Sequence, residues 1–227
     1  MKVKWLKFRF PKSFEKCGNE LLQCNYSGAK GKGFSINYFS KDKLDGMYIE
    51  RELKKEISLD PFGHSEESII TTYYVVKFSF IKDSGLVRVD SPPRSLKKFS
   101  RALHETLGIG SSITDIRIDP LSWFNLVQVK HPTLVISHLA MSELALSKKS
   151  LASAIISSSG DAREELDKLA DGRPFKVASI RIRDSQQSTP SWVEYSKMGS
   201  VKIHGALAPD IERCSEQALE KLVNATN

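Results

Sequence analysis

Glu52 and Lys54, separated by Leu53, form the short motif in this sequence that best fits enzyme chemistry. Some metal-dependent nucleases carry Glu-x-Lys on a strand, where carboxylate oxygens hold Mg²⁺ and the lysine helps to steer a water molecule. Asp42 or Asp45 would supply the second carboxylate. The alternative function that the sequence allows is therefore a metal-dependent nuclease centred on Glu52 and Lys54. The competing interpretation is a chance motif in a charged segment of a protein that has no intrinsic catalysis.

Three further motifs lack the companions that their chemistry needs. Ser95 and Lys98 give the Ser-x-x-Lys of some acyl enzymes, but no Ser-Asp-Asn or Lys-Thr-Gly accompanies them, so Ser95 is better explained as a helix N-cap. His64 and Glu66 begin a deaminase-type pattern that no Pro-Cys-x-x-Cys completes. The glycine-rich segment 28–33 precedes a predicted strand and not a helix, which favours a hairpin turn over a phosphate-binding loop.

The three cysteines, Cys17, Cys24 and Cys214, are predicted to be free thiols. An odd number in a chain of 227 residues argues against a disulfide framework. None of them has the paired ligand spacing of a structural zinc site, so we expect no metal and no cofactor. These features predict a reducing, cytoplasmic location. No stretch reaches the roughly 20 apolar residues of a membrane span, so no membrane partner is expected.

Clusters of basic residues are the strongest functional signal in the sequence. The net charge is +7, which favours polyanionic partners. Segments 94–101 and 173–183 each contain four cations and no acid, whereas segment 42–67 holds eight acids against four bases. Alternate residues of a strand point the same way, so Arg181 and Arg183 should share a face. The candidate residues for binding nucleic acid or an acidic protein partner are Lys4, Lys7, Arg9, Lys97, Lys98, Arg101, Arg181 and Arg183.

Hydrophobic periodicity predicts an α+β fold, in which an antiparallel sheet carries helices on one face. Period-two alternation indicates strands near 1–10, 34–39, 47–59, 71–81, 86–89, 175–183, 192–195 and 200–203. Asp45-Gly46 is typical of a hairpin turn. Segment 134–156 is apolar and is interpreted as two strands. Amphipathic helices are expected at 95–107, with Leu96, Phe99 and Leu103 buried, and at 209–223, with Ile211, Ala218 and Leu222 buried.

Shorter helices are expected elsewhere. Residues 12–24 and 161–169 fit such helices, the second opened by the capping pair Asp161 and Glu164. Residues 120–129 should form another, with Leu121, Phe124 and Leu126 available for burial.

The two long helices follow similar strands, which suggests two related halves. Residues 85–89 lead through a break to the first helix, and residues 199–203 lead to the second in the same layout. The organisation that this pattern favours is an N-terminal α+β half over 1–110 and a C-terminal α+β half over 111–227. One continuous domain is the alternative, because strand–turn–strand–helix is a common unit.

The end of the chain also resembles a known fold family. Trp192 to Tyr195, Gly199 to Ile203, then Gly205-Ala206 and a helix are similar to the last strand pair and helix of TATA-box-binding-protein-like repeats. The resemblance covers about 35 of the 227 residues. It implies a curved antiparallel sheet backed by helices, and it implies no DNA binding by itself, because one fold hosts many functions. The corresponding segment of the N-terminal half has Ser91-Pro92-Pro93 in place of Gly-Ala.

Taken together, these patterns predict a non-catalytic basic accessory protein. We expect it to bind nucleic acid, to dock into a multiprotein complex, or to do both. Nucleic acid and an acidic protein partner fit the charge pattern about equally.

Overall fold

The structure is a computed structural model that describes residues 1–59, 61–147, 149–186, 191–205 and 209–225. The chain divides into two compact units. We call Lys7–Ile113 the N-terminal unit, and Met1–Leu6 together with Thr114–Asn227 the C-terminal unit. The strands pair antiparallel and the helices pack beside them, so the predicted α+β class is confirmed. Whether residues 1–110 and 111–227 form two related domains stays a prediction.

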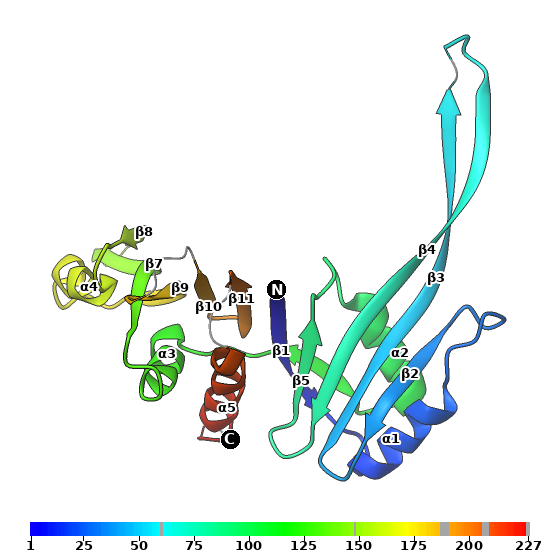
Figure 1. Ribbon diagram of the computed structural model, residues 1–227, viewed down its shortest axis with the longest axis horizontal. Coiled ribbons are helices and arrows are strands. Elements are labelled where there is room, and N and C mark those ends of the chain that lie inside the picture. Colours follow the sequence, from blue (N-terminus) through cyan, green and yellow to red (C-terminus); the bar gives the residue numbers. More distant parts are fainter. Residues whose placement is uncertain (60, 148, 187–190, 206–208, 226–227) are drawn as a thin grey trace. The chain divides into compact units, whose positions relative to one another are not determined.

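The N-terminal unit is a sheet with two helices on one face (Figure 1). Its elements are the end of β1 (Lys2–Arg9), α1 (Phe14–Gln23), β2 (Lys32–Phe39), β3 (Lys43–Leu59), β4 (Ser65–Ile81), β5 (Leu86–Asp90) and α2 (Lys97–Leu107). The strands lie in the order β2-β3-β4-β5. Aromatic side chains fill the space between sheet and helices, because Phe99 of α2 packs 5.1 Å from Phe78 and 6.1 Å from Tyr48, ring centre to ring centre.

The C-terminal unit repeats this two-layer plan. Its elements are the start of β1, then the end of β6 (Ser112–Asp115), α3 (Pro120–Gln128), β7 (Leu134–Ser147), β8 (Ser150–Ser157), α4 (Ala162–Ala170), β9 (Lys176–Asp184), β10 (Trp192–Ser196), β11 (Ser200–His204) and α5 (Pro209–Ala225). The strand order is β11-β10-β9-β7-β8, and Lys2–Lys4 of β1 pair with β11. Trp123 of α3 packs against Tyr195 of β10, with ring centres 4.7 Å apart, and its indole N–H donates to the backbone oxygen of Ser215 in α5.

The predicted turn at Asp45-Gly46 is wrong, because both residues lie inside β3. The chain reverses earlier, where Ser40 N–H bonds to the Lys43 carbonyl. Gly46 is instead required by close packing, because a Cβ at this position would lie 2.8 Å from the Ser35 oxygen and 2.9 Å from the Ile36 side chain. Ile36 sits where the β2–β3 register shifts, so the glycine permits close approach of two strands at a bulge.

The predictions for α3 and α5 need correction. The buried positions of α3 include Trp123, Phe124 and Val127, whereas Leu126 is exposed, because the apolar face is rotated from the one expected. In α5 the expected burial of Ile211 and Ala218 is confirmed, but Leu222 is only half-buried.

Helix α2 begins two residues later than predicted. Leu96 is half-buried in the N-cap position and Lys97 is the first helical residue, although Ser95 Oγ still accepts a hydrogen bond from the Lys97 N–H. The expected burial of Phe99 and Leu103 is confirmed.

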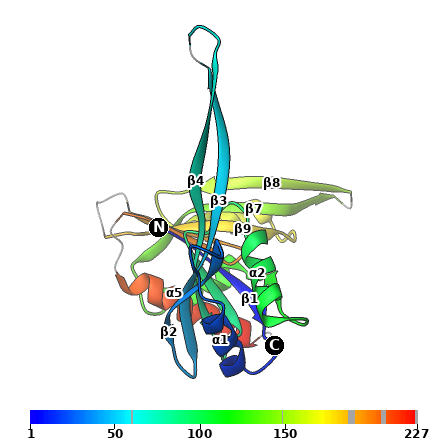
Figure 2. The same cartoon turned by 90° about the vertical axis from the view of Figure 1, so that its right-hand side faces the viewer.

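A long hairpin extends from the N-terminal unit (Figures 1 and 2). Strand β2 pairs with β3 only as far as Glu50, and β5 pairs with β4 only from Lys77 onward, so the hairpin continues as a two-stranded ribbon. We call residues 51–73 the arm. No described helix of either unit is long and apolar enough to cross a membrane.

Candidate nucleic-acid interface

The eight basic residues expected to bind a partner are divided between the two units. Lys4, Arg181 and Arg183 belong to the C-terminal unit, whereas the other five belong to the N-terminal unit. Within the N-terminal unit, Lys7 and Arg9 lie on β1 on the side opposite the buried Phe8. Lys97, Lys98 and Arg101 lie on α2, in the helical layer. The sheet therefore separates the two groups, and they do not form one surface.

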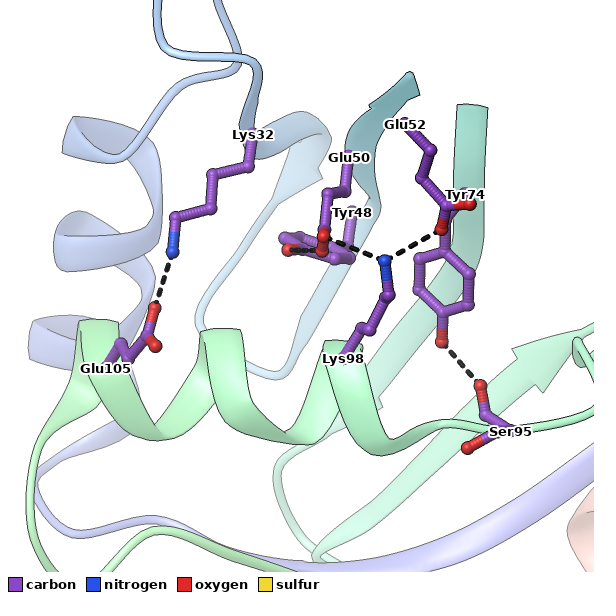
Figure 3. A network of polar contacts seen from close by, with 8 residues as sticks. All are labelled: Lys32, Tyr48, Glu50, Glu52, Tyr74, Ser95, Lys98 and Glu105. Carbon is purple, nitrogen blue, oxygen red and sulfur yellow. Dashed lines mark hydrogen bonds and ion pairs between the residues drawn. The ribbon is translucent and has the colours of Figure 1, made fainter. Parts of the chain in front are cut away.

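Lys98 is held in a polar network with side chains of β3 (Figure 3). Its Nζ lies 3.0 Å from Glu50 Oε1 and 2.8 Å from Glu52 Oε1, and the Tyr48 hydroxyl donates to Glu50 at 2.7 Å. Burial of Glu50 opposes its ionisation, but the hydrogen bonds from Tyr48 and Lys98 outweigh this and hold its pKa below the ordinary value. Lys98 is thus neutralised by two carboxylates, which weakens its case as a phosphate ligand.

The same network bears on the nuclease alternative. Glu52 is engaged by Lys98, and Lys54 is exposed on the arm. Asp45 pairs with Lys43, and it lies seven residues before Glu52 on one strand, which puts roughly 23 Å between their Cα atoms at the usual strand rise. Asp42 lies further away still along the chain. The structure brings neither aspartate to Glu52, and the described residues contain no group of three side chains suited to a metal.

The helix-free face of the C-terminal sheet carries the other predicted cations. In β9 the buried Ile180 and Ile182 alternate with Arg181 and Arg183, which therefore point away from the helices. The two arginines therefore lie on the same face of the sheet, as their spacing predicts. Arg183 donates from Nη2 to the Ser159 carbonyl, so its head group is held over the edge of the sheet.

Arg181 and two neighbouring flat side chains stand side by side across three strands. The Arg181 guanidinium carbon lies 4.2 Å from the centre of the Trp192 ring. On β11, His204 lies directly opposite Trp192, and the two rings are nearly parallel, with centres 5.4 Å apart and planes at 18°. We call Arg181, Trp192 and His204 the stack. Cation–π contact and ring stacking fix the orientation of these side chains on the sheet face.

Glu194 fixes the cations around the stack. Arg181 Nη2 lies 3.2 Å from Glu194 Oε2, and Lys202 Nζ lies 2.6 Å from Glu194 Oε1. Burial of Glu194 opposes ionisation, but hydrogen bonds from Lys202 and Arg181 prevail and keep its pKa below the ordinary value. The carboxylate therefore stays charged and orients two cations from the strands on either side.

The charge of this face is positive. Lys2 lies directly opposite Lys202 across the β1–β11 pairing, an arrangement of like charges that destabilises a strand pair. Lys4 is bound to Asp115 at 2.7 Å, so its charge is compensated. Exposed His138 lies opposite Arg181 on β7. The cations on the face are Lys2, Lys4, Arg181, Arg183 and Lys202, with Glu194 among them.

Sequence reasoning found the two arginines and missed their surroundings. Trp192, Glu194 and His204 alternate with less exposed residues on β10 and β11, so their common face could be inferred from periodicity. The contact between β9 and β10 could not be inferred from the sequence, because no local pattern reveals which strands become neighbours.

No protein-family model matches the sequence, and no curated protein is similar to it. Function is therefore inferred from this geometry alone.

Proposed function

We propose that this protein binds single-stranded nucleic acid on the helix-free face of its C-terminal unit and that it does so without catalysis. The observation that carries the proposal is the stack of Arg181, Trp192 and His204, surrounded by cations on one sheet face. Free thiols at all three cysteines support a reducing compartment, so we place this function in the cytoplasm.

Two kinds of contact support a single strand as the ligand. Lysines and arginines along a groove or face neutralise phosphates, and flat side chains stack against unpaired bases of any sequence. Lys2 and Arg183 provide the first kind of contact on either side of the stack. The bases of a duplex are already stacked on each other, so a stacking surface favours an unpaired strand.

An acidic protein is the second candidate partner for this face. It would use the same lysines and arginines, but it would make no use of a stacking plane. The two proposals therefore differ in what the stack contributes, and nucleic acid explains both the charge and the aromatic side chains.

The test is a titration of labelled single-stranded DNA and RNA at low and at moderate salt, followed by fluorescence anisotropy. The double variant Lys2→Glu/Arg183→Glu leaves the Glu194 contacts intact, because neither residue bonds to that carboxylate. We expect it to lose most affinity and to flatten the plot of log K against log salt by about one unit per lost phosphate contact.

The matched control is Lys97→Glu/Arg101→Glu, which makes the same change in net charge on the exposed side of α2. It should bind almost as the wild type does. If both double variants weaken binding equally, net charge alone is responsible and the face is not a site. If the wild type fails to bind any strand at low salt, the proposal is wrong.

A further inference from the structure

A pocket opens between the sheet and helix α2 in the N-terminal unit. Its volume is about 370 Å³, inside the range of roughly 300–1,000 Å³ that is typical of sites for small organic molecules. The described residues that line it all belong to this one unit. They come from the segment that follows α1, from strands β2 and β3, and from the second half of α2.

The interior of this pocket is apolar. Phe34, Tyr48 and Ala102 line it and are buried, so they form its inner wall. The Tyr48 hydroxyl already donates to Glu50, which leaves the ring of Tyr48 as the surface open to a ligand. A ligand therefore needs an apolar body. A nucleobase or a sugar fits poorly, because its polar groups would lose their hydrogen bonds to water at this wall without replacement.

The wall on the β2 side is held in place by backbone hydrogen bonds. Phe34 N–H donates to the Cys24 carbonyl at 2.9 Å, and Tyr26 N–H donates to the Phe34 carbonyl at 2.8 Å. Gly33 permits this close contact, because a Cβ there would lie 2.6 Å from the Tyr26 Cα. The wall is therefore formed before any ligand arrives, and binding requires no ordering of this segment.

The charges at the mouth of the pocket favour an anion. Lys32 Nζ lies 2.8 Å from Glu105 Oε2, so an ion pair joins β2 to α2 and these two charges compensate each other (Figure 3). Lys30 also lines the pocket and is exposed, and its ammonium bonds to no acceptor among the residues that the structure describes. One uncompensated positive charge thus lies beside an apolar interior.

We propose that this pocket binds a small apolar carboxylate, whose body lies against Phe34 and Tyr48 and whose head group pairs with Lys30. Burial of apolar surface favours binding, and the cation at the mouth selects a negatively charged ligand over a neutral one of the same shape. The stack belongs to the C-terminal unit, so this site does not depend on the proposed function and can be present or absent without it.

The first experiment titrates the full chain with naphthoate and with naphthamide, its uncharged counterpart, by isothermal titration calorimetry at low salt. The wild type should bind one naphthoate per chain, roughly tenfold more tightly than naphthamide, because only the carboxylate pairs with Lys30. Lys30→Glu should abolish this preference. The fold should be unaffected, because Lys30 is exposed and only its backbone N–H is bonded, to Ser27.

Lys41→Glu is the matched control. It makes the same change in net charge on an exposed side chain between β2 and β3, at the other end of β2, and it does not line the pocket. It should bind both compounds as the wild type does. A wild type that binds no naphthoate, equal affinity for the two compounds, or equal losses in the two variants overturns the proposal.

The second experiment locates the ligand through Cys24, which lines the same pocket. Cys17 and Cys214 are buried, so iodoacetamide should alkylate Cys24 first, as measured by mass spectrometry of the digested chain. Naphthoate at about ten times its dissociation constant should slow this alkylation about tenfold, because the occupied pocket covers the thiol. The same concentration should give Lys30→Glu much less protection. An unchanged alkylation rate at Cys24 in wild type saturated with naphthoate would place the ligand elsewhere and overturn the site.

Discussion

At the scale of single residues, Trp192 carries the clearest prediction. Trp5 and Trp123 are fully buried, so Trp192 is the tryptophan whose emission should respond to a bound base. We expect single-stranded nucleic acid to quench the emission of the wild type. Trp192→Ala should lose this quenching and about 1–3 kcal/mol of binding free energy, the usual contribution of one stacked base.

Trp192→Phe provides the control, because phenylalanine keeps a stacking plane without the indole fluorophore. It should retain most of the affinity when binding is followed by anisotropy. An alanine variant that binds as tightly as the wild type would show that the stack only braces the sheet face and makes no contact with bases.

Single residues also show where sequence reasoning stops. The outward direction of Arg181 and Arg183 follows from strand alternation alone, and it was predictable. The neutralisation of Lys98 was not predictable, because Glu50 and Glu52 lie more than forty positions away in the chain. They contact Lys98 only after β3 has packed beside α2. Long-range ion pairs of this kind have no local signature.

At the scale of elements, helix α2 is held by its apolar face. Leu103 is 1% exposed within the N-terminal unit, so Leu103→Ala removes buried methyl groups and leaves a cavity. We expect a loss of about 2–5 kcal/mol in the free energy of unfolding, measured by denaturant titration.

Leu126→Ala is the matched control on α3. Leu126 is 37% exposed, and alanine has the higher helix propensity, so the same chemical change should cost little there. Equal losses at the two positions would contradict the packing described for both helices. The comparison also explains the error in α3: nine residues contain few turns, and a weakly amphipathic segment leaves the buried side open to misassignment.

The types of the elements could be predicted from the sequence in part. Strands with strong alternation, such as β4 and β9, were found, and so were the helices that follow a proline or a capping residue. The length of the β3–β4 hairpin was not predicted, because Asp45-Gly46 gives a strong local turn signal. The bulge between β2 and β3 overrides that signal. Tertiary packing, in the form of one strand approaching another, decided that conflict.

At the scale of the whole molecule, nucleic-acid binding should be separable from the arm. The face of the stack belongs to the C-terminal unit, and the arm belongs to the N-terminal unit. Because Glu50 and Tyr74 are directly opposed on β3 and β4, residues 51–73 can be replaced by Asn-Gly, a two-residue hairpin turn. The shortened chain keeps the contact between Lys98 and Glu50 and every contact of the stack.

We expect this shortened chain to bind single-stranded nucleic acid with close to wild-type affinity. The physical reason is that truncation leaves the cations and aromatic planes untouched, while the loss of acidic side chains favours a polyanion slightly. Fluorescence anisotropy with labelled single strands measures this affinity for the shortened and the full chain. Loss of binding would place part of the nucleic-acid site on the arm.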